Sequence, residues 1–214
     1  MKFKFRYEPI ISPEGGVLSY EMLTEIRGRC DSLIAFNELN SSDRIEIFLA
    51  QISHIEDIVK KSCGEIIVSL NVDVMCGYYI VKDPSLKDRI SKLRDFIRLE
   101  ISEEFEFLAG SHDDAIIREL SSICPLWLDD FGCGNTNLSY LSEVCFEMVK
   151  VDKILLWRYE KAPYAFEYLV NTIGQYCTGV IIEGVNSINN EKICNNINAS
   201  GKQGFLWSSK ENLK

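Results

Sequence analysis

Short apolar segments alternate with helical segments along most of this chain, and polar residues stand at the ends of the apolar segments. We predict strands at residues 2–11, 17–26, 66–71, 96–101, 126–128, 146–151, 179–182 and 203–207, and helices at 41–62, 113–123, about 162–176 and 187–196. Six of these strands are entered through a helical or loop crossover, which is typical of a parallel β/α protein. The pattern predicts an α/β barrel in one domain over residues 1–214.

The first two predicted strands are joined differently, by a tight turn. Phe3, Phe5 and Tyr7 alternate with basic residues, as in a half-buried strand. The five residues 12–16, which contain one proline and two glycines, are too few for a parallel crossover. We therefore predict an antiparallel hairpin, which is an irregular start for a barrel.

Composition excludes several classes of function. The net charge is −9 and the sequence pI is about 4.9, which argues against broad DNA or RNA binding because that requires a basic surface. No apolar run approaches the roughly 18 residues of a membrane span, so we expect no membrane partner. The eight cysteines contain no Cys-x-x-Cys pair and no signal peptide precedes them, which predicts reduced thiols in a cytoplasmic protein. Neither of the two histidines stands in a metal-ligand spacing, so any metal should have oxygen ligands.

Two adjacent carboxylates, Asp129 and Asp130, follow the apolar residues 126–128. Neighbouring side chains of a strand point to opposite faces, so both can reach one ion only if the chain leaves regular strand geometry at this point. Gly132 and Gly134 permit that departure. The alternative is an acidic turn without function, because Asp and Gly are common in turns.

Other polar residues stand at or near the ends of the remaining predicted strands. They are Glu21, Asn71, Glu100, Lys150, Asp152 and Glu183. If they share one barrel mouth with the two aspartates, the excess of negative charge requires divalent cations. Mg²⁺ or Mn²⁺ suits oxygen ligands, and two such ions roughly 3.5–4 Å apart form the arrangement that hydrolyses phosphodiesters. Each residue also has a structural reading, such as helix cap for Asn71 or Asp152 and surface ion pair for Lys150.

The residues at these positions match a known motif series. The chain resembles EAL domains, the bacterial cyclic di-GMP phosphodiesterases, from Tyr7 to about Ser209. The motifs, in order, are Tyr7-Glu8-Pro9-Ile10, Tyr20-Glu21-Met22-Leu23, Val68-Ser69-Leu70-Asn71, Glu100-Ile101-Ser102-Glu103, the Asp-Asp-Phe-Gly-x-Gly loop at 129–134, Lys150-Val151-Asp152, Glu183-Gly184-Val185 and Gln203-Gly204. Several motifs in one order make the resemblance specific.

The resemblance implies a modified TIM (β/α)8 barrel whose first strand runs antiparallel to the rest. It also implies hydrolysis of cyclic di-GMP to linear pGpG with two Mg²⁺ or Mn²⁺ ions. By motif position, the first ion would be held by Glu21, Asn71, Glu100 and Asp129, and the second by Asp129, Asp130 and Glu183 with support from Asp152. Lys150 would orient the attacking water, so that Lys150, Glu21 and Glu183 form the catalytic set. Leu23, Asn71 and Gln203 would contact the substrate, and Glu103 would anchor a loop that in this family couples to homodimer formation.

Several departures from the family pattern leave a second reading open. Met22 replaces the usual Ala, Glu8 replaces a nucleotide-contacting Gln, and Glu25 replaces an Arg that faces a substrate phosphate. Arg27 has the strand parity of Glu25 and is our candidate for compensation. Asn186 also replaces an acid, and 135–137 replaces an aromatic-Ser-Ser sequence. The alternative function is a catalytically silent EAL-like module that acts as a cyclic di-GMP receptor or as a protein-binding regulator of a transcription factor.

Overall fold

In the computed structural model, the described residues are 2–27, 33–61, 66–103, 105, 114–133, 141–142 and 144–207. Their elements in chain order are β1 (Lys2–Ile11), β2 (Val17–Arg27), β3 (Leu33–Ile34), η2 (Phe36–Glu38), α1 (Ser41–Lys61), β4 (Val68–Asn71), α2 (Val74–Lys82), α3 (Pro84–Lys92), β5 (Ile97–Ser102), α4 (Asp114–Ile123), β6 (Leu126–Phe131), β7 (Met148–Val151), α6 (Lys153–Arg158), α7 (Pro163–Ile173), β8 (Gly179–Ile182), α8 (Ile188–Asn195) and β9 (Gly201–Lys202). No helix among the described residues is long and apolar enough to cross a bilayer.

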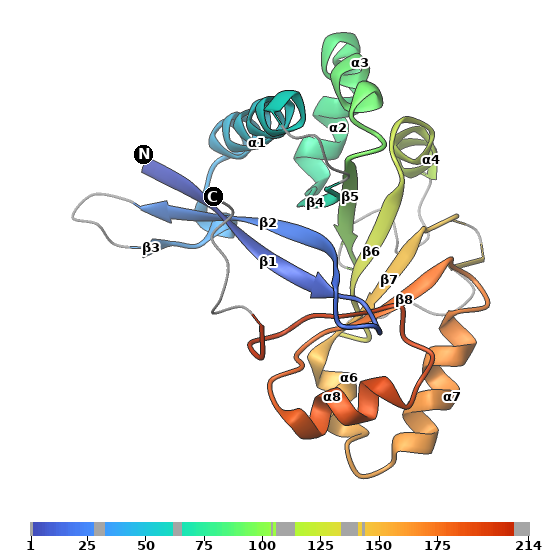
Figure 1. Cartoon of the computed structure of the whole chain (residues 1–214). Helices are drawn as coiled ribbons and strands as arrows, with labels where there is room; N and C mark the ends of the chain where they lie inside the picture. Colours follow the sequence, from blue (N-terminus) through green and yellow to red (C-terminus); the bar gives the residue numbers. More distant parts are fainter. Residues whose placement is uncertain are drawn as a thin grey trace.

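Eight strands close into a barrel. The sheet order is β1-β9-β8-β7-β6-β5-β4-β2-β3, and an additional β1–β2 pairing joins the two ends of the eight-stranded part. The short strand β3 pairs with the far end of β2, outside the closed ring. Figure 1 shows the ring with helices around it. The predicted modified TIM barrel is therefore confirmed.

The predicted antiparallel hairpin is also confirmed. β1 and β2 pair in antiparallel register from Lys2↔Arg27 to Ile10↔Ser19, and β1 pairs antiparallel with β9. The remaining barrel pairings are parallel. β2 is paired with β4 over Tyr20–Met22, whereas its later residues pair with β1 and β3. The β1–β2 hairpin thus extends beyond the ring as a ribbon (Figure 1).

Two layers fill the inside of the barrel. Ile10, Trp127 and Ile181 form an apolar cluster that is separate from the main core between strands and helices. Residues two positions along these strands point to the same face, which places Asp129 and Glu183 above the apolar layer. The apolar layer therefore supports a polar layer at the barrel mouth.

Some predicted boundaries were wrong. The last strand is Gly201–Lys202 rather than 203–207, because those two residues pair with Ile181 and Ile182 of β8. β6 continues to Phe131, beyond the predicted end at residue 128. Helix α1 is capped by Asn40, whose Oδ1 accepts the Asp43 N–H at 2.9 Å. The helices α2 and α3 were not predicted.

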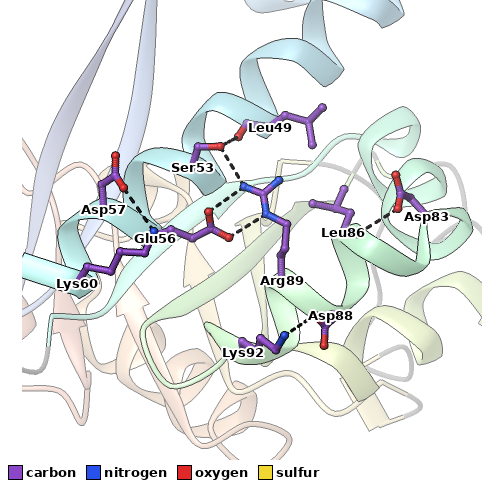
Figure 2. A network of polar contacts seen from close by, with 10 residues as sticks. All are labelled: Leu49, Ser53, Glu56, Asp57, Lys60, Asp83, Leu86, Asp88, Arg89 and Lys92. Atoms are coloured by element: carbon purple, nitrogen blue, oxygen red, sulfur yellow. Dashed lines mark hydrogen bonds and ion pairs between the residues drawn. The ribbon is translucent and has the colours of Figure 1, made fainter.

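The α1–α3 contact is held by polar groups that Figure 2 shows at close range. Arg89 of α3 donates from Nε and Nη2 to the two carboxylate oxygens of Glu56 on α1, at 2.8 and 3.0 Å. The same guanidinium donates to Ser53 Oγ at 3.0 Å. α3 begins after Asp83, whose Oδ1 accepts the backbone N–H groups of Ser85 and Leu86. A bidentate ion pair and a helix cap thus fix the position of α3.

We expect Arg89→Ala to lower the free energy of unfolding by about 0.5–1 kcal/mol at neutral pH, as for a partly exposed ion pair. The hydrogen bonds from Arg89 lower the pKa of Glu56 in the folded protein. The pair therefore stabilises the fold at pH values above the pKa of Glu56 in the unfolded chain, and this stabilisation is lost as the pH falls through the lowered pKa of the folded state. Urea denaturation at pH 7 and at a pH well below 4 measures both effects. The control is Lys92→Ala, whose ion pair with Asp88 is solvent-exposed. An equal loss at both pH values would contradict the assignment.

Candidate metal centre

Lys150 is the centre of a buried cluster of charges. The side chain lies in the interior, 1% exposed, and comes from β7. Its Nζ lies 3.2 Å from Glu21 Oε2, 3.0 Å from Glu100 Oε2, 2.9 Å from Asp129 Oδ1 and 3.0 Å from Glu183 Oε1. The four carboxylates come from β2, β5, β6 and the residue after β8. Strands far apart in sequence therefore deliver their predicted site residues to one point.

Two amides complete the surroundings of Glu21. Asn71 Nδ2 donates to Glu21 Oε1 at 2.8 Å, and Gln203 Nε2 donates to Glu21 Oε2 at 2.6 Å. Asn71 is the last residue of β4, whereas Gln203 directly follows β9. Glu21 itself lies within β2, but it pairs with Ser69 one position before the β2–β4 pairing ends. Its position in the barrel is thus equivalent to a strand end.

Negative charge exceeds positive charge in this cluster, and the pKa values reflect it. Burial alone would lower the pKa of Lys150, but the four carboxylates outweigh burial and raise that pKa well above its usual range. Burial raises the pKa of Glu100 well above normal, although Lys150 opposes the shift. Burial also raises the pKa of Glu183 to about 7, and Asp129 adds to the shift. Burial opposes the charge of Glu21, yet Lys150, Gln203 and Asn71 together lower its pKa.

Asp129 and Asp130 lie on a bulge of β6. The register with β7 shifts between Leu128 and Phe131, so two residues of β6 stand opposite one residue of β7. Asp130 adopts φ = 57°, in the left-handed region that Asp tolerates better than most residues. The bulge is the departure from strand geometry that the paired aspartates required. Burial, with Asp129 beside it, raises the pKa of Asp130 to about 6.

The acidic side chains fall into two groups that share a member. One oxygen each from Glu21, Glu100 and Asp129 lie within 4.8 Å of one another, and so do oxygens from Asp129, Asp130 and Glu183. These are hard oxygen donors without histidine or thiolate, which suits Mg²⁺ or Mn²⁺. A shared aspartate between two such groups suits two neighbouring ions. The residues present therefore fit the divalent cations that the sequence motifs imply.

Asp152 and Glu103 lie at the edge of this centre. Asp152 accepts the Ile154 N–H at 2.7 Å and thereby caps α6, which agrees with its structural reading. Its carboxylate also lies within 4.8 Å of ligand atoms of Asp130 and Cys133. Glu103 is buried, and its backbone N–H donates to the Asp129 carbonyl at 3.2 Å. Gly134 and the segment 135–137 lie outside the described residues.

Two cavities flank the charged cluster. A cavity of about 250 Å³ is lined by Glu21, Glu183 and Gln203, together with Glu8, Lys153, Trp157, Asn186 and Phe205. A second cavity, of about 410 Å³, is lined by Asn71, Leu23 and Met22, together with Arg6, Thr24, Phe36, Phe48, Gln51 and Cys76. Sequence reasoning missed Arg6, Lys153, Trp157 and Phe205. The alternation of β1 places Arg6 on the face of Glu8, Lys153 and Phe205 directly follow recognised motifs, and Trp157 lies in α6.

The residues that depart from the family pattern have defined partners. Glu25 Oε1 accepts hydrogen bonds from Arg27 Nε and Nη2 at 3.1 and 2.8 Å. Its other oxygen, Oε2, lies 3.0 Å from Lys4 Nζ. Glu8 pairs with Arg6 at 3.0 Å. Asn186 Oδ1 accepts the backbone N–H of Phe205 at 3.0 Å. Both acidic substitutions are thus neutralised within the ribbon.

The cysteines of the described part are free thiols. Cys76, Cys124 and Cys194 are buried, and burial raises the pKa of all three thiols well above the usual range. Cys133 and Cys145 are exposed. Cys30 and Cys63, like His112, lie outside the described residues. The three buried thiols are part of the main hydrophobic core.

Comparison with known proteins identifies the family. A family model described as the EAL domain matches residues 1–210. Cyclic di-GMP phosphodiesterase PdeH of Escherichia coli (strain K12) is 27% identical over 218 residues, which cover 95% of this chain and 82% of PdeH. The crystal structure of the EAL-like domain protein YdiV has a TM-score of 0.83 at 18% identity, over 96% of this chain and 92% of YdiV. A c-di-GMP complex of the PaMucR phosphodiesterase has a TM-score of 0.71 at 17% identity, over 96% and 90%. This chain belongs to the EAL domain family.

Proposed function

We propose that this protein is a metal-dependent phosphodiesterase that hydrolyses cyclic di-GMP to linear pGpG. The observation that carries the proposal is the cluster around Lys150, in which every expected metal ligand is present and Asp129 belongs to two ligand groups. Loss of one ligand usually silences a metal site, and none is lost here. The 27% identity to a cyclic di-GMP phosphodiesterase over 82% of that relative supports the same activity.

Each residue has a role in this proposal. Glu21, Asn71, Glu100 and Asp129 would hold one cation, and Asp129, Asp130 and Glu183 would hold a second, with Asp152 beside them. Bound Mg²⁺ or Mn²⁺ would activate water and stabilise charge on the phosphate oxygens. The Lys150 ammonium would orient the attacking water, whose oxygen forms the new bond to phosphorus while the bond to the 3′ oxygen breaks. The departing 3′ oxygen takes a proton, which leaves a 5′-phosphate on pGpG.

The surrounding side chains would bind and orient the substrate. Gln203 fixes the Glu21 carboxylate and lines the smaller cavity, whereas Leu23 and Asn71 line the larger one. The apolar layer beneath the cluster, which includes Trp127, keeps water out of the barrel interior. Arg27 would compensate the negative charge of Glu25 through its hydrogen bonds to that carboxylate. These contacts would hold one phosphate of the cyclic dinucleotide against the cations.

The proposal includes a homodimer, with Glu103 as the anchor of the loop that follows β6, and action in the cytoplasm, where the thiols remain reduced. Cyclic di-GMP is the proposed partner, with no role for DNA, RNA or a membrane. The reversed charge at Glu25 favours a second candidate, an EAL-like module that binds cyclic di-GMP or a transcription factor without hydrolysis. The retained ligand set favours the enzyme over this module.

The test is turnover by the purified protein. With MnCl₂ or MgCl₂ and cyclic di-GMP, we expect pGpG to appear on chromatography, and EDTA should abolish it because the buried carboxylates need divalent cations to bind a phosphate. Addition of excess Mn²⁺ after EDTA should restore the rate. Binding of cyclic di-GMP without pGpG would support the receptor, and neither binding nor turnover would support the protein-binding regulator.

A further inference from the structure

Arg6 lies where two cavities meet on the inner face of the β1–β2 ribbon. It pairs across the strands with Leu23, and the neighbouring pair on the same face joins Glu8 and Glu21. Arg6 lines the 410 Å³ cavity that also contacts Asn71. It also lines a cavity of about 590 Å³ with Leu23, Thr24 and Glu25. One guanidinium thus stands beside the metal centre, two positions along the strand from the pair that contains Glu21.

Two other cations of this ribbon face, Lys4 and Arg27, are engaged with Glu25. Lys4 lies 3.0 Å from one of its oxygens, and Arg27 donates twice to the other. Arg6 bonds with Glu8 instead, and its side chain is 52% exposed. Among the described residues, Arg6 is the cation that lines the cavity next to Asn71. Lys153 lines the opposite cavity, where its charge acts on Asp130 of the metal centre.

The cavity next to Asn71 has the chemistry of a nucleotide site. Phe36, Phe48 and Leu23 supply apolar and aromatic walls for a base. Gln51 and Thr24 supply polar groups, with Gln51 Nε2 already donating to Thr24 Oγ1 at 3.1 Å. A guanidinium at the edge adds the planar fork that suits phosphate. The occupant that fits is an anionic ligand with an aromatic ring.

We propose that Arg6 binds the phosphate of the cyclic dinucleotide that is not cleaved. The inference rests on the proposed function, which assigns one phosphate to the metal centre. The second phosphate brings another negative charge to a protein whose net charge is −9, so it needs a cation of its own. Because Glu25 engages Lys4 and Arg27, Arg6 supplies that cation. Arg6 is therefore a specificity-determining residue, and Glu8 competes with the substrate for it.

The test compares three ribbon variants in the full chain. Arg6→Gln removes the charge. We expect KM to rise about 10-fold or more, while kcat stays within about 3-fold of wild type. The reason is that Arg6 would make the same charged hydrogen bond in the ground state and in the transition state. Glu8→Gln releases Arg6 and should lower KM several-fold. Lys4→Gln is the matched control, because it removes the same charge from the same face while Glu25 keeps Arg27. Its KM should stay within about 2-fold of wild type.

The outcomes separate this inference from the proposed function. If the protein binds cyclic di-GMP without hydrolysis, calorimetry of the same variants replaces KM with the dissociation constant, and the expected changes are the same. Normal turnover with equal KM values for wild type and Arg6→Gln would overturn the role of Arg6 and leave the phosphodiesterase standing. Equal weakening in Arg6→Gln and Lys4→Gln would reduce the effect to general charge and also overturn it. A wild-type protein that neither binds nor hydrolyses would overturn both.

Discussion

Replacing Lys150 with methionine is expected to lower the melting temperature of the metal-free protein by about 6–20 °C, which corresponds to about 3–5 kcal/mol for loss of one partner of a buried ion pair. Lys150 is 1% exposed and lies within 3.2 Å of four carboxylate oxygens. Methionine fills a similar volume but leaves those carboxylates without their central cation. Their mutual repulsion then opposes folding.

Divalent cations provide the second half of this prediction. Each of the four carboxylates that contact Lys150 belongs to one of the two groups that fit metal ions, so bound Mn²⁺ should offset the lost positive charge. Saturating MnCl₂ should therefore raise the melting temperature of Lys150→Met more than that of wild type. Differential scanning fluorimetry in EDTA and in MnCl₂ measures both shifts, with circular dichroism as the check that the variant is folded.

Lys153→Met serves as the matched control for lost charge. Lys153 is exposed at the start of α6, and we expect its variant to melt within about 2–3 °C of wild type in EDTA. If Lys150→Met melts as high as Lys153→Met in EDTA, the central ammonium does not stabilise the cluster. If MnCl₂ stabilises wild type and Lys150→Met equally, the carboxylates that Lys150 contacts are not the ones that bind the ions.

The sequence predicted the polar layer because of a property of parallel barrels. Strand ends of one direction meet at one mouth, so Asn71, Glu100 and Glu183 could be grouped without knowledge of their distances. Asp129 and Asp130 are adjacent, and adjacent side chains of a regular strand point to opposite faces. A site that uses both therefore required a break in the strand, and the structure contains one as a bulge with Asp130 at φ = 57°. The position of the bulge was predictable, but its conformation was not, because a left-handed φ occurs at Asp130 as well as at Gly132.

The missed elements depend on contacts that a local pattern does not contain. α2 has a glycine and several β-branched or aromatic residues, which are weak helix formers, so its helix depends on the cap from Asp73 and on packing against its neighbours. The Asp83–Pro84 junction, which ends α2 and begins α3, resembles a loop signal in sequence. β9 is short because its extent is set by pairing with Ile181 and Ile182 of β8.

The role of the ribbon was also beyond local reasoning. Alternation assigns Arg6 and Glu8 to one face, but only the register with β2 places them opposite Leu23 and Glu21. β2 continues beyond its pairing with β4, which ends at Met22↔Leu70, and the next residues, Leu23 and Asn71, line the 410 Å³ cavity. The position of Arg6 depends on how far the neighbouring strands extend, so the sequence around Arg6 does not predict it. Arg27 has the predicted parity, and its bond to Glu25 became visible only in the structure.

Glu21→Ala is expected to abolish pGpG formation, and Glu21→Gln to lower kcat/KM by at least about 100-fold, as for loss of charge at a metal centre. Glu21 belongs to the first ligand group and contacts Asn71, Gln203 and Lys150. The glutamine side chain keeps the shape but removes the negative charge, and its amide meets donors at both ends. Turnover with Mn²⁺, measured by chromatography, is the readout. Glu46→Gln on the exposed face of α1 is the control for a lost carboxylate.

The stability of the same variant separates a functional role from a structural one. Glu21→Gln removes one of four negative charges around Lys150. Its free energy of unfolding should therefore change by roughly 1 kcal/mol, and its melting temperature in EDTA should stay within a few degrees of wild type. In the double variant with Lys150→Met, the relief of repulsion should restore part of the stability that Lys150→Met loses. Additive losses would mean that Glu21 and Lys150 act independently, which their 3.2 Å contact argues against. Retained turnover in a folded Glu21→Gln protein would refute the assignment of Glu21 to the metal centre.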